Sequence, residues 1–338
     1  MTISANVSFF AQSMSQANRL NDLRATMDDL QRQVTTQKKY ETFSGFGTDS
    51  FSLQRLKSSQ PLLRSYIDNI DKVSTRMELM NTAMTKISEL GNQLVTAIHV
   101  QSQSGQDGIE TINQLARQSL QFVEDLINQT LDGHCLFAGS DVTSPPFIGD
   151  TVLNSNFKTQ VDVWLAGGQT NAQLIAVTDG FTSGNLGLAP GLATSGNITA
   201  HIDQNMDIDY TIRADEDGFK DILRALAFAA NLRYPDPATD VATPAQFDDI
   251  LNNILSVVTN GVQEMNRTAQ QLASKFDLLK SIRENHVSDL GMVTTQIDKM
   301  ENVDTTTALV SLQTMQTQLT ASYQITKIVS ELSLVNFM

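Results

Sequence analysis

The chain has 338 residues, a net charge of −14 and one cysteine, Cys135. This length allows two or three domains with a sizeable core, and a single cysteine excludes a disulfide framework within the chain. The negative charge argues against a nucleic-acid-binding protein, because phosphate contacts need clustered lysine and arginine and the nearest basic run is Gln37-Lys38-Lys39.

The first predicted helix covers residues 8–40. Its apolar residues follow the spacing of one helix face, most regularly over the last five: Phe10, Met14, Ala17, Leu20, Leu23, Met27, Leu30 and Val34. Two glycines, Gly45 and Gly47, then break the pattern and predict a turn.

The longest periodic stretch covers residues 63–98 and keeps a heptad pattern, with Pro61 ahead of it as a start signal. A helix of this length is about 50 Å long and needs partner helices along its whole length. Glycines at 105 and 108 mark a turn, after which a second amphipathic helix is predicted as an antiparallel neighbour. The apolar face predicted for this second helix consists of Ile112, Leu115, Ser119, Phe122 and Leu126.

Residues 149–214 differ from the helical regions because they are rich in Gly, Asn, Thr and Asp. Alternating apolar residues at 161–165, 174–178 and 208–212 predict short strands. Helix returns over residues 219–230, where Asp215-Glu216-Asp217 is expected to cap it. The prolines 235, 237 and 244 interrupt that helix.

A second long heptad run covers residues 247–300. A last helix is predicted to begin near Asp304, with Thr305 and Thr306 as other cap candidates, and to continue to the chain end. Arg283 and His286 occupy apolar positions of the heptad run. Polar residues at such positions often fix the register of a coiled coil, and we predict that role for these two.

The predicted fold class is mainly α, a long antiparallel helical bundle or coiled coil formed by the N- and C-terminal regions, with a small β-rich inserted domain. Three domains are expected. Residues 1–40 and 303–338 form a terminal coiled-coil assembly domain, residues 41–148 and 215–302 form a helical bundle domain, and residues 149–214 form the insert.

Both chain ends carry more apolar surface than one helical partner can cover. Ile325, Ile328, Val329, Leu332 and Val335 share an arc of about 120° on the last helix, whereas Leu334 and Phe337 lie outside it. Because uncovered apolar faces usually mark association sites, we predict an assembly interface. Its proposed members are Phe9, Phe10, Leu332, Leu334, Val335 and Phe337.

The terminal regions resemble the bacterial flagellin family. Residues 309–314, 319–323 and 332–337 look like that family's C-terminal helix, and Ser44-Gly45 with Asp49 looks like its turn after the first helix, without the usual consecutive aspartates and proline. Residues 132–140, with the sequence Asp-Gly-His-Cys-Leu-Phe-Ala-Gly-Ser, and Pro146-Phe147 are similar to the segment that closes the helical region of the hook–filament junction proteins, the third type of hook-associated protein. The resemblance covers roughly residues 1–147 and 245–338 and is weak across the insert.

The resemblance implies a structural role in the bacterial flagellum, between the hook and the filament and outside the cell. It implies type III export without a cleaved signal, and residues 1–7 indeed lack the pattern of such a signal. The implied partners are further copies of the chain in a ring, hook-associated protein 1, flagellin and an export chaperone. Flagellin itself remains an alternative because the terminal motifs are shared, and a type III secreted adhesin is a third reading.

No enzyme activity, cofactor or metal is expected. The four histidines are scattered and form no H-E-x-x-H zinc motif. Residues 203–207 begin like a calcium loop, but Ile208 and Ala214 occupy the positions that require glycine and glutamate. No apolar run reaches the roughly 18 residues that span a membrane, so membrane insertion is not expected. We therefore predict no catalytic, cofactor-binding or metal-binding residues.

Overall fold

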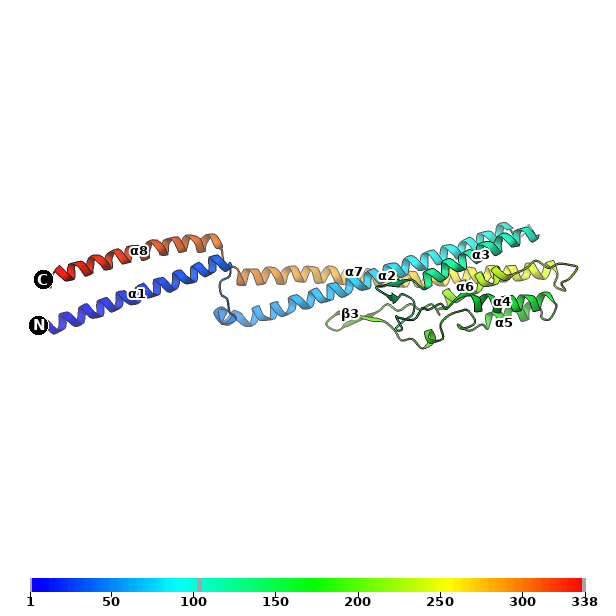
Figure 1. The fold of residues 1–338 in the computed structure, drawn as a ribbon, viewed down its shortest axis with the longest axis horizontal. Coiled ribbons are helices and arrows are strands. Elements are labelled where there is room, and N and C mark those ends of the chain that lie inside the picture. Colours follow the sequence, from blue (N-terminus) through cyan, green and yellow to red (C-terminus); the bar gives the residue numbers. More distant parts are fainter. Residues whose placement is uncertain (1, 102–104, 336–338) are drawn as a thin grey trace. The chain divides into compact units, whose positions relative to one another are not determined.

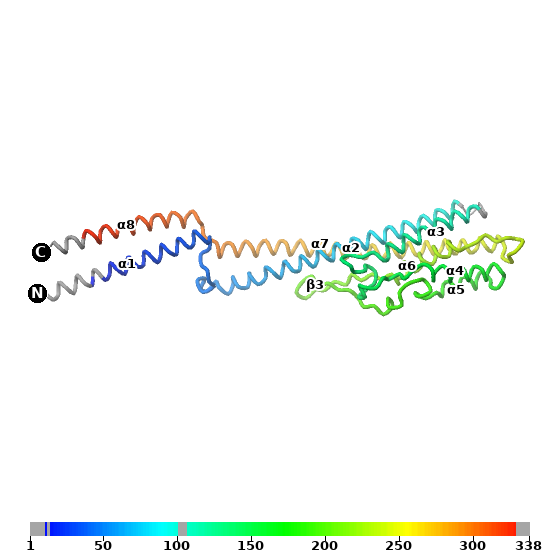
Figure 2. Tube along the Cα trace, in the orientation of Figure 1, coloured from blue at the N-terminus to red at the C-terminus, as the bar shows by residue number. Residues whose placement is uncertain are grey.

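The computed structural model describes residues 2–101 and 105–335, and side chains at 11, 14–100 and 107–328 (Figure 2). The described chain is mainly helical (Figure 1). Its long helices are α1 (Thr2–Thr36), α2 (Ser50–Gln101), α3 (Gly105–Ile127), α4 (Asp150–Leu165), α5 (Asn171–Asp179), α6 (Asp217–Asn231), α7 (Pro244–Glu301) and α8 (Thr305–Val335). The shorter elements are η1 (Phe43–Asp49), η2 (Pro190–Thr194), β1 (Thr130–Leu131), β2 (His134–Cys135), β3 (Thr199–Asp203) and β4 (Met206–Asp209).

The predicted fold class is confirmed. Long helices dominate, and the strands of the described residues form two antiparallel pairs, β1–β2 and β3–β4. Contacts within the chain separate two compact units, unit 1 (residues 1–64 and 287–338) and unit 2 (residues 65–286), and helices α2 and α7 contribute to both. The three predicted domain ranges stay a prediction.

The heptad pattern of α2 correctly identifies its buried face. From Tyr66 to Ile98 the apolar positions of the pattern are buried. In unit 2, Arg283 on α7 pairs with Asp71 on α2. Val262, which comes earlier on α7, lies opposite Gly91, which comes later on α2. Each step forward along α2 therefore matches a step back along α7, which is the antiparallel arrangement that we predicted.

The predicted start of α2 is wrong. The helix begins at Ser50, so Pro61 lies inside it. Proline removes one backbone hydrogen bond from a helix interior, but Leu53 is fully buried one turn after the start, and this packing favours helix on the N-terminal side of the proline.

The predicted face of α3 is displaced by about one position. Phe122 is more than half exposed, whereas Val123 and Ala116 are buried. The predicted Ile112 and Ser119 are buried. Elsewhere the packing of α3 against α6 buries Ala116, Val123 and Ile127 in place of Leu115, Phe122 and Leu126.

Two of the three predicted strands of the insert are helices. Residues 161–165 end α4, whose buried side chains Leu153, Phe157 and Val161 recur every four residues. Residues 174–178 lie in α5, which Thr170 and Gln173 cap reciprocally. Local alternation misled the prediction because Val163, one of the alternating residues, is exposed on the helix, whereas Trp164 next to it is buried. The third predicted strand overlaps β4, which pairs with β3.

Candidate assembly surfaces

Helices α1 and α8 pair with each other in unit 1, as Figure 1 shows. From Leu20 to Val34 the α1 residues predicted for this face are half-buried, and so is a matching stripe on α8, whereas the predicted Met14 and Ala17 are exposed. Across the pair, the Arg24 guanidinium donates from Nε to the Tyr323 hydroxyl at 2.7 Å and lies 5.4 Å from the ring centre. The half-buried residues are Leu20, Leu23, Met27, Leu30 and Val34 on α1, and Leu312, Met315, Leu319 and Ser322 on α8.

The opposite side of α8 carries a second stripe at heptad spacing. Its large members, Val310, Ile325 and Ile328, are each more than half exposed. Thr314, Thr317 and Ala321 lie between them and are also exposed. We call these six residues the outer stripe. A two-helix arm can bury only one face of each helix, so the outer stripe has no partner among the described residues.

The predicted interface residues lie at the edges of the description. The backbones of Phe9, Phe10, Leu332, Leu334 and Val335 belong to α1 or α8, but their side chains lie outside the described residues, as does all of Phe337. Their role as assembly contacts stays a prediction.

Helices α1 and α8, which together we call the arm, are joined to the rest of unit 1 where residues 37–39 and 301–303 run antiparallel; we call this stretch the crossing. Lys39 N donates to Glu301 O at 2.8 Å, and Val303 N donates to Gln37 O at 3.0 Å. The Glu301 side chain, almost buried, forms ion pairs with Lys57 and with Lys38. Next to the crossing, Asp304 accepts hydrogen bonds from Thr306 N and Thr307 N, which confirms it as the cap of α8.

An exposed aromatic group follows the crossing. Tyr40, Phe43 and Phe51 are 41%, 45% and 68% exposed, and Phe46 packs edge-on against Tyr40 with ring centres 5.1 Å apart. We call these four residues the aromatic knuckle. Gly45 makes it possible, because a Cβ there would lie 2.5 Å from Cγ of Tyr40.

In unit 2, the segment that resembles the junction proteins fastens other parts of the chain. Ala214 N donates to Phe137 O at 3.0 Å, and Arg76 on α2, largely buried, donates to the carbonyls of Cys135 and Leu136. Cys135 is buried, and burial raises the pKa of its thiol.

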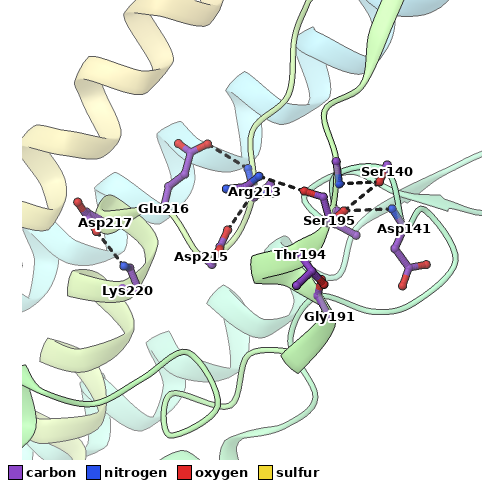
Figure 3. A network of polar contacts seen from close by, with 12 residues as sticks. Ser140, Asp141, Gly191, Thr194, Ser195, Arg213, Asp215, Glu216, Asp217 and Lys220 are labelled. Atoms are coloured by element: carbon purple, nitrogen blue, oxygen red, sulfur yellow. Dashed lines mark hydrogen bonds and ion pairs between the residues drawn. The ribbon is translucent and has the colours of Figure 1, made fainter.

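Figure 3 shows how the end of this segment is held. Ser140 Oγ accepts from Gly196 N at 2.8 Å, and Ser195 Oγ donates to Ala138 O at 2.7 Å. Gly139 has a φ of 65°, and a Cβ there would lie 2.5 Å from Ser195 Oγ. The segment is therefore a structural clamp between the parts of the chain that it contacts.

The acidic triplet 215–217 lies at the N-terminus of α6 as predicted, with Asp217 in the first turn, but it makes no side-chain capping bond. Glu216 occupies the cap position without a side-chain bond to the helix, and its carboxylate accepts from Arg213 N at 3.1 Å (Figure 3). Asp215 pairs with Arg213 Nε, and Asp217 pairs with Lys220, which lowers the pKa of Asp217. Asp215 and Glu216 therefore hold the turn at Arg213, whereas Asp217 forms an ion pair within the first turn of α6.

Arg283 and His286 face unit 2 from α7. Arg283 donates from Nε to Asp71 Oδ1 at 2.5 Å, and this partner raises the pKa of Arg283. The buried His286 lies 2.8 Å from Ile202 O through Nε2 and stacks on Tyr66 with ring centres 5.4 Å apart. Both residues thus contact α2 or the β3–β4 hairpin, and their effect on register stays a prediction.

The net charge is concentrated in one unit. Unit 1 contains ten lysines and arginines against ten aspartates and glutamates, whereas unit 2 contains thirteen against twenty-seven. Unit 2 therefore carries the whole charge of −14, and copies of unit 1 can approach each other without net repulsion.

Within the described part of the chain, no cluster of three or more His, Cys, Asp or Glu residues could hold a metal ion. Among the helices described, none is both long and apolar enough to cross a membrane.

No protein-family model matches the sequence, and no curated protein matches it. Solved structures do match. One is a candidate flagellar hook-associated protein from Vibrio parahaemolyticus, with 15% sequence identity and a TM-score of 0.50, aligned over 75% of this chain and 97% of that one. The chain shares the fold of this protein. At such low identity the likeness concerns the fold alone.

Sequence reasoning placed Ile325 and Ile328 in one apolar arc of the last helix but missed the rest of the outer stripe, and it missed the aromatic knuckle, although both left a signal. Val310, Thr314, Thr317 and Ala321 already repeat at heptad spacing, but threonine and alanine carry little hydrophobic weight. The knuckle places four aromatic residues within twelve positions of a chain that is only 6% aromatic. The glycines between these aromatic residues predicted a turn, and a turn by itself does not predict an exposed aromatic cluster.

Proposed function

We propose that this chain is a structural subunit of the bacterial flagellum, located at the junction between hook and filament. The observation that carries the proposal is the arm formed by α1 and α8, whose pairing leaves the outer stripe of α8 uncovered. Exposed aliphatic stripes of this length mark association surfaces. The shared fold with the Vibrio protein and the sequence of residues 132–140 add support.

In this role the chain forms a ring with further copies, contacts hook-associated protein 1 on one side and flagellin on the other, and reaches its place through type III export with an export chaperone. The chain acts by binding and not by catalysis. Unit 2, with its charge of −14, would stay apart from its own copies while neutral unit 1 makes the contacts.

Flagellin is the second candidate, because residues 309–314 resemble a motif that both kinds of protein share. The two differ in how they grow. A flagellin repeats one contact along an open helix, whereas a junction subunit meets different neighbours on its two sides and terminates.

A deletion strain tests the proposal. It should build hooks and release flagellin monomers into the medium, and the purified chain should not extend filament seeds. Normal filaments in the deletion strain would contradict the function, and long filaments grown from the purified chain would identify a flagellin.

The outer stripe can be tested in the same strain. A chain with Val310→Ser, Ile325→Ser and Ile328→Ser should fold normally, since these side chains are exposed, but should fail to restore filaments. The matched control replaces exposed polar residues of the same helix, Gln313→Ser and Gln318→Ser, and should restore them. Restoration by the triple variant would remove the stripe from the interface.

A further inference from the structure

The aromatic knuckle is exposed and firmly held. Tyr40 lies against Phe46 and above Gly45, and Lys57 Nζ lies 5.5 Å from the centre of the Phe43 ring. Lys57 is itself anchored by its ion pair with Glu301. Rigid, exposed aromatic rings lose little conformational entropy on binding, and they often supply most of the binding energy at protein interfaces.

The knuckle is unusual within this molecule. Five aromatic rings are exposed among the described residues, and three of them lie between positions 40 and 51. The other two are Phe122 in unit 2 and Tyr323, which Arg24 contacts. An exposed cluster of this kind calls for a partner surface.

Charge indicates which surface of a second copy fits. Residues 37–64 hold five basic residues against two acidic ones, so they repel a basic partner surface, and the exposed rings need a partner that is apolar. The outer stripe of α8 meets this requirement because it consists of Val, Thr, Ala and Ile. Its small middle residues, Thr317 and Ala321, allow another surface to approach closely.

We propose that the aromatic knuckle of one copy binds the outer stripe of α8 of a second copy. The two surfaces differ, so the contact is head to tail, and repetition of such a contact closes a ring when the rotation permits. This inference rests on the proposed function and names the contact through which neighbouring copies meet.

Cysteine crosslinking of the purified full-length chain tests the contact. One variant carries Phe51→Cys and another carries Val310→Cys, and a short bismaleimide is added to each and to their mixture. Crosslinked dimer should form in the mixture at least tenfold more than in either variant alone. The natural Cys135 is buried and serves as an unreactive background.

Each other result has a defined meaning. Dimer in the Phe51→Cys sample alone would show knuckle-to-knuckle contact, dimer in the Val310→Cys sample alone would show stripe-to-stripe contact, and absence of dimer in the mixture would show no contact. All three overturn the inference. A Ser155→Cys variant, exposed in unit 2, replaces the knuckle cysteine as the negative control.

A second substitution separates the ring contribution from the position of the cysteine. Adding Phe43→Ser to the Phe51→Cys chain should reduce dimer yield roughly tenfold, the typical effect of truncating an interface aromatic. Adding Phe122→Ser, which changes an exposed phenylalanine of unit 2, should leave the yield unchanged. Equal dimer yields from the chain with Phe43→Ser and the chain with Phe122→Ser would overturn the inference.

Failure of the proposed function gives a different result. If the mixed variants crosslink in solution but the chain is absent from isolated flagella, the contact stands and the flagellar role is wrong. If the chain is present in flagella and the mixture gives no dimer, the role stands and the contact is wrong.

Discussion

Unit 1 and unit 2 bury very different amounts of apolar surface. Among the described side chains of unit 1, the buried hydrophobic ones are Leu53, Ile297 and Ala308. Unit 2 contains a continuous core that includes Trp164, Phe137 and most of the apolar face of α2. Since burial of apolar area is the main favourable term in folding, unit 2 can be stable alone and unit 1 has little to stabilise it.

The difference in charge follows the same division. Unit 2 carries −14 and would repel its own copies, whereas unit 1 is neutral and exposes the outer stripe and the aromatic knuckle. Similar heptad patterns therefore serve two purposes. In unit 2 they build the core, and in unit 1 they leave apolar faces for other molecules.

The largest effect is expected from the core of unit 2. Phe137 is fully buried with its ring centre 5.2 Å from that of Phe219, so Phe137→Ala should lower the free energy of unfolding by about 3–5 kcal/mol. Chemical denaturation measures the loss. Phe122→Ala removes the same atoms from an exposed site and should change stability little, and equal losses would contradict our description of the core.

The division itself can be tested with a fragment. Residues 65–286 form one continuous segment that contains the core, so this fragment should fold and melt within a few degrees of the main transition of the full chain. Calorimetry on both provides the measurement. A fragment without a cooperative transition would show that unit 2 depends on unit 1.

A smaller effect is expected in the arms. Leu23 is only half-buried against α8, so Leu23→Ala should cost about 1 kcal/mol or less, below the range for fully buried leucines. The helical signal of the arms should weaken, while the main thermal transition of unit 2 stays in place. A shift of that transition as large as that of Phe137→Ala would mean that the units unfold together.

The pH dependence should also distinguish the units. Burial raises the pKa of Glu216, Asp221 and Glu124 in unit 2, and neighbouring carboxylates add to the increase. A carboxyl with a raised pKa holds its proton in the folded state at pH values where the unfolded chain has released it. Stability should therefore rise as the pH falls from 7 towards the unfolded value of about 4.

The melting temperature of unit 2 should accordingly be higher at pH 5 than at pH 7, and Glu216→Gln should remove part of the increase. In unit 1, hydrogen bonds from Thr307 and Thr306 lower the pKa of Asp304. The stabilisation that Asp304 provides is present at pH values above the pKa of the same carboxyl in the unfolded chain. It is lost only as the pH falls through the lowered pKa of the folded state, so it should not change between pH 7 and 5. A lower melting temperature of unit 2 at pH 5 would contradict the assignment of these carboxyls.

The smallest effect is expected from the cap of α8. Asp304→Ala removes the acceptor for Thr306 N and Thr307 N and should weaken only the first turn of the helix. Hydrogen exchange at these amides should increase at pH 7, with no change in unit 2. Protection equal to that of the unchanged chain would show that Asp304 does not act as the cap.

The sequence by itself determined the long helices and most of their buried faces. Apolar residues that repeat every three or four positions over many turns leave little choice of conformation, so the heptads of α2 and α7 and the cap at Asp304 were predictable. The resemblance of the terminal and clamp segments to known proteins was likewise readable from residues alone.

Tertiary structure decided what short or ambiguous patterns left open. Residues 161–165 alternate like a strand, yet the spacing from Leu153 to Phe157 and packing of α4 on α6 make them helical. On α3, two stripes were available and contact with α6 chose one, which turned Phe122 outward. On α8, a single sequence offers two apolar faces, and only pairing with α1 determines which is covered and which remains for a second molecule.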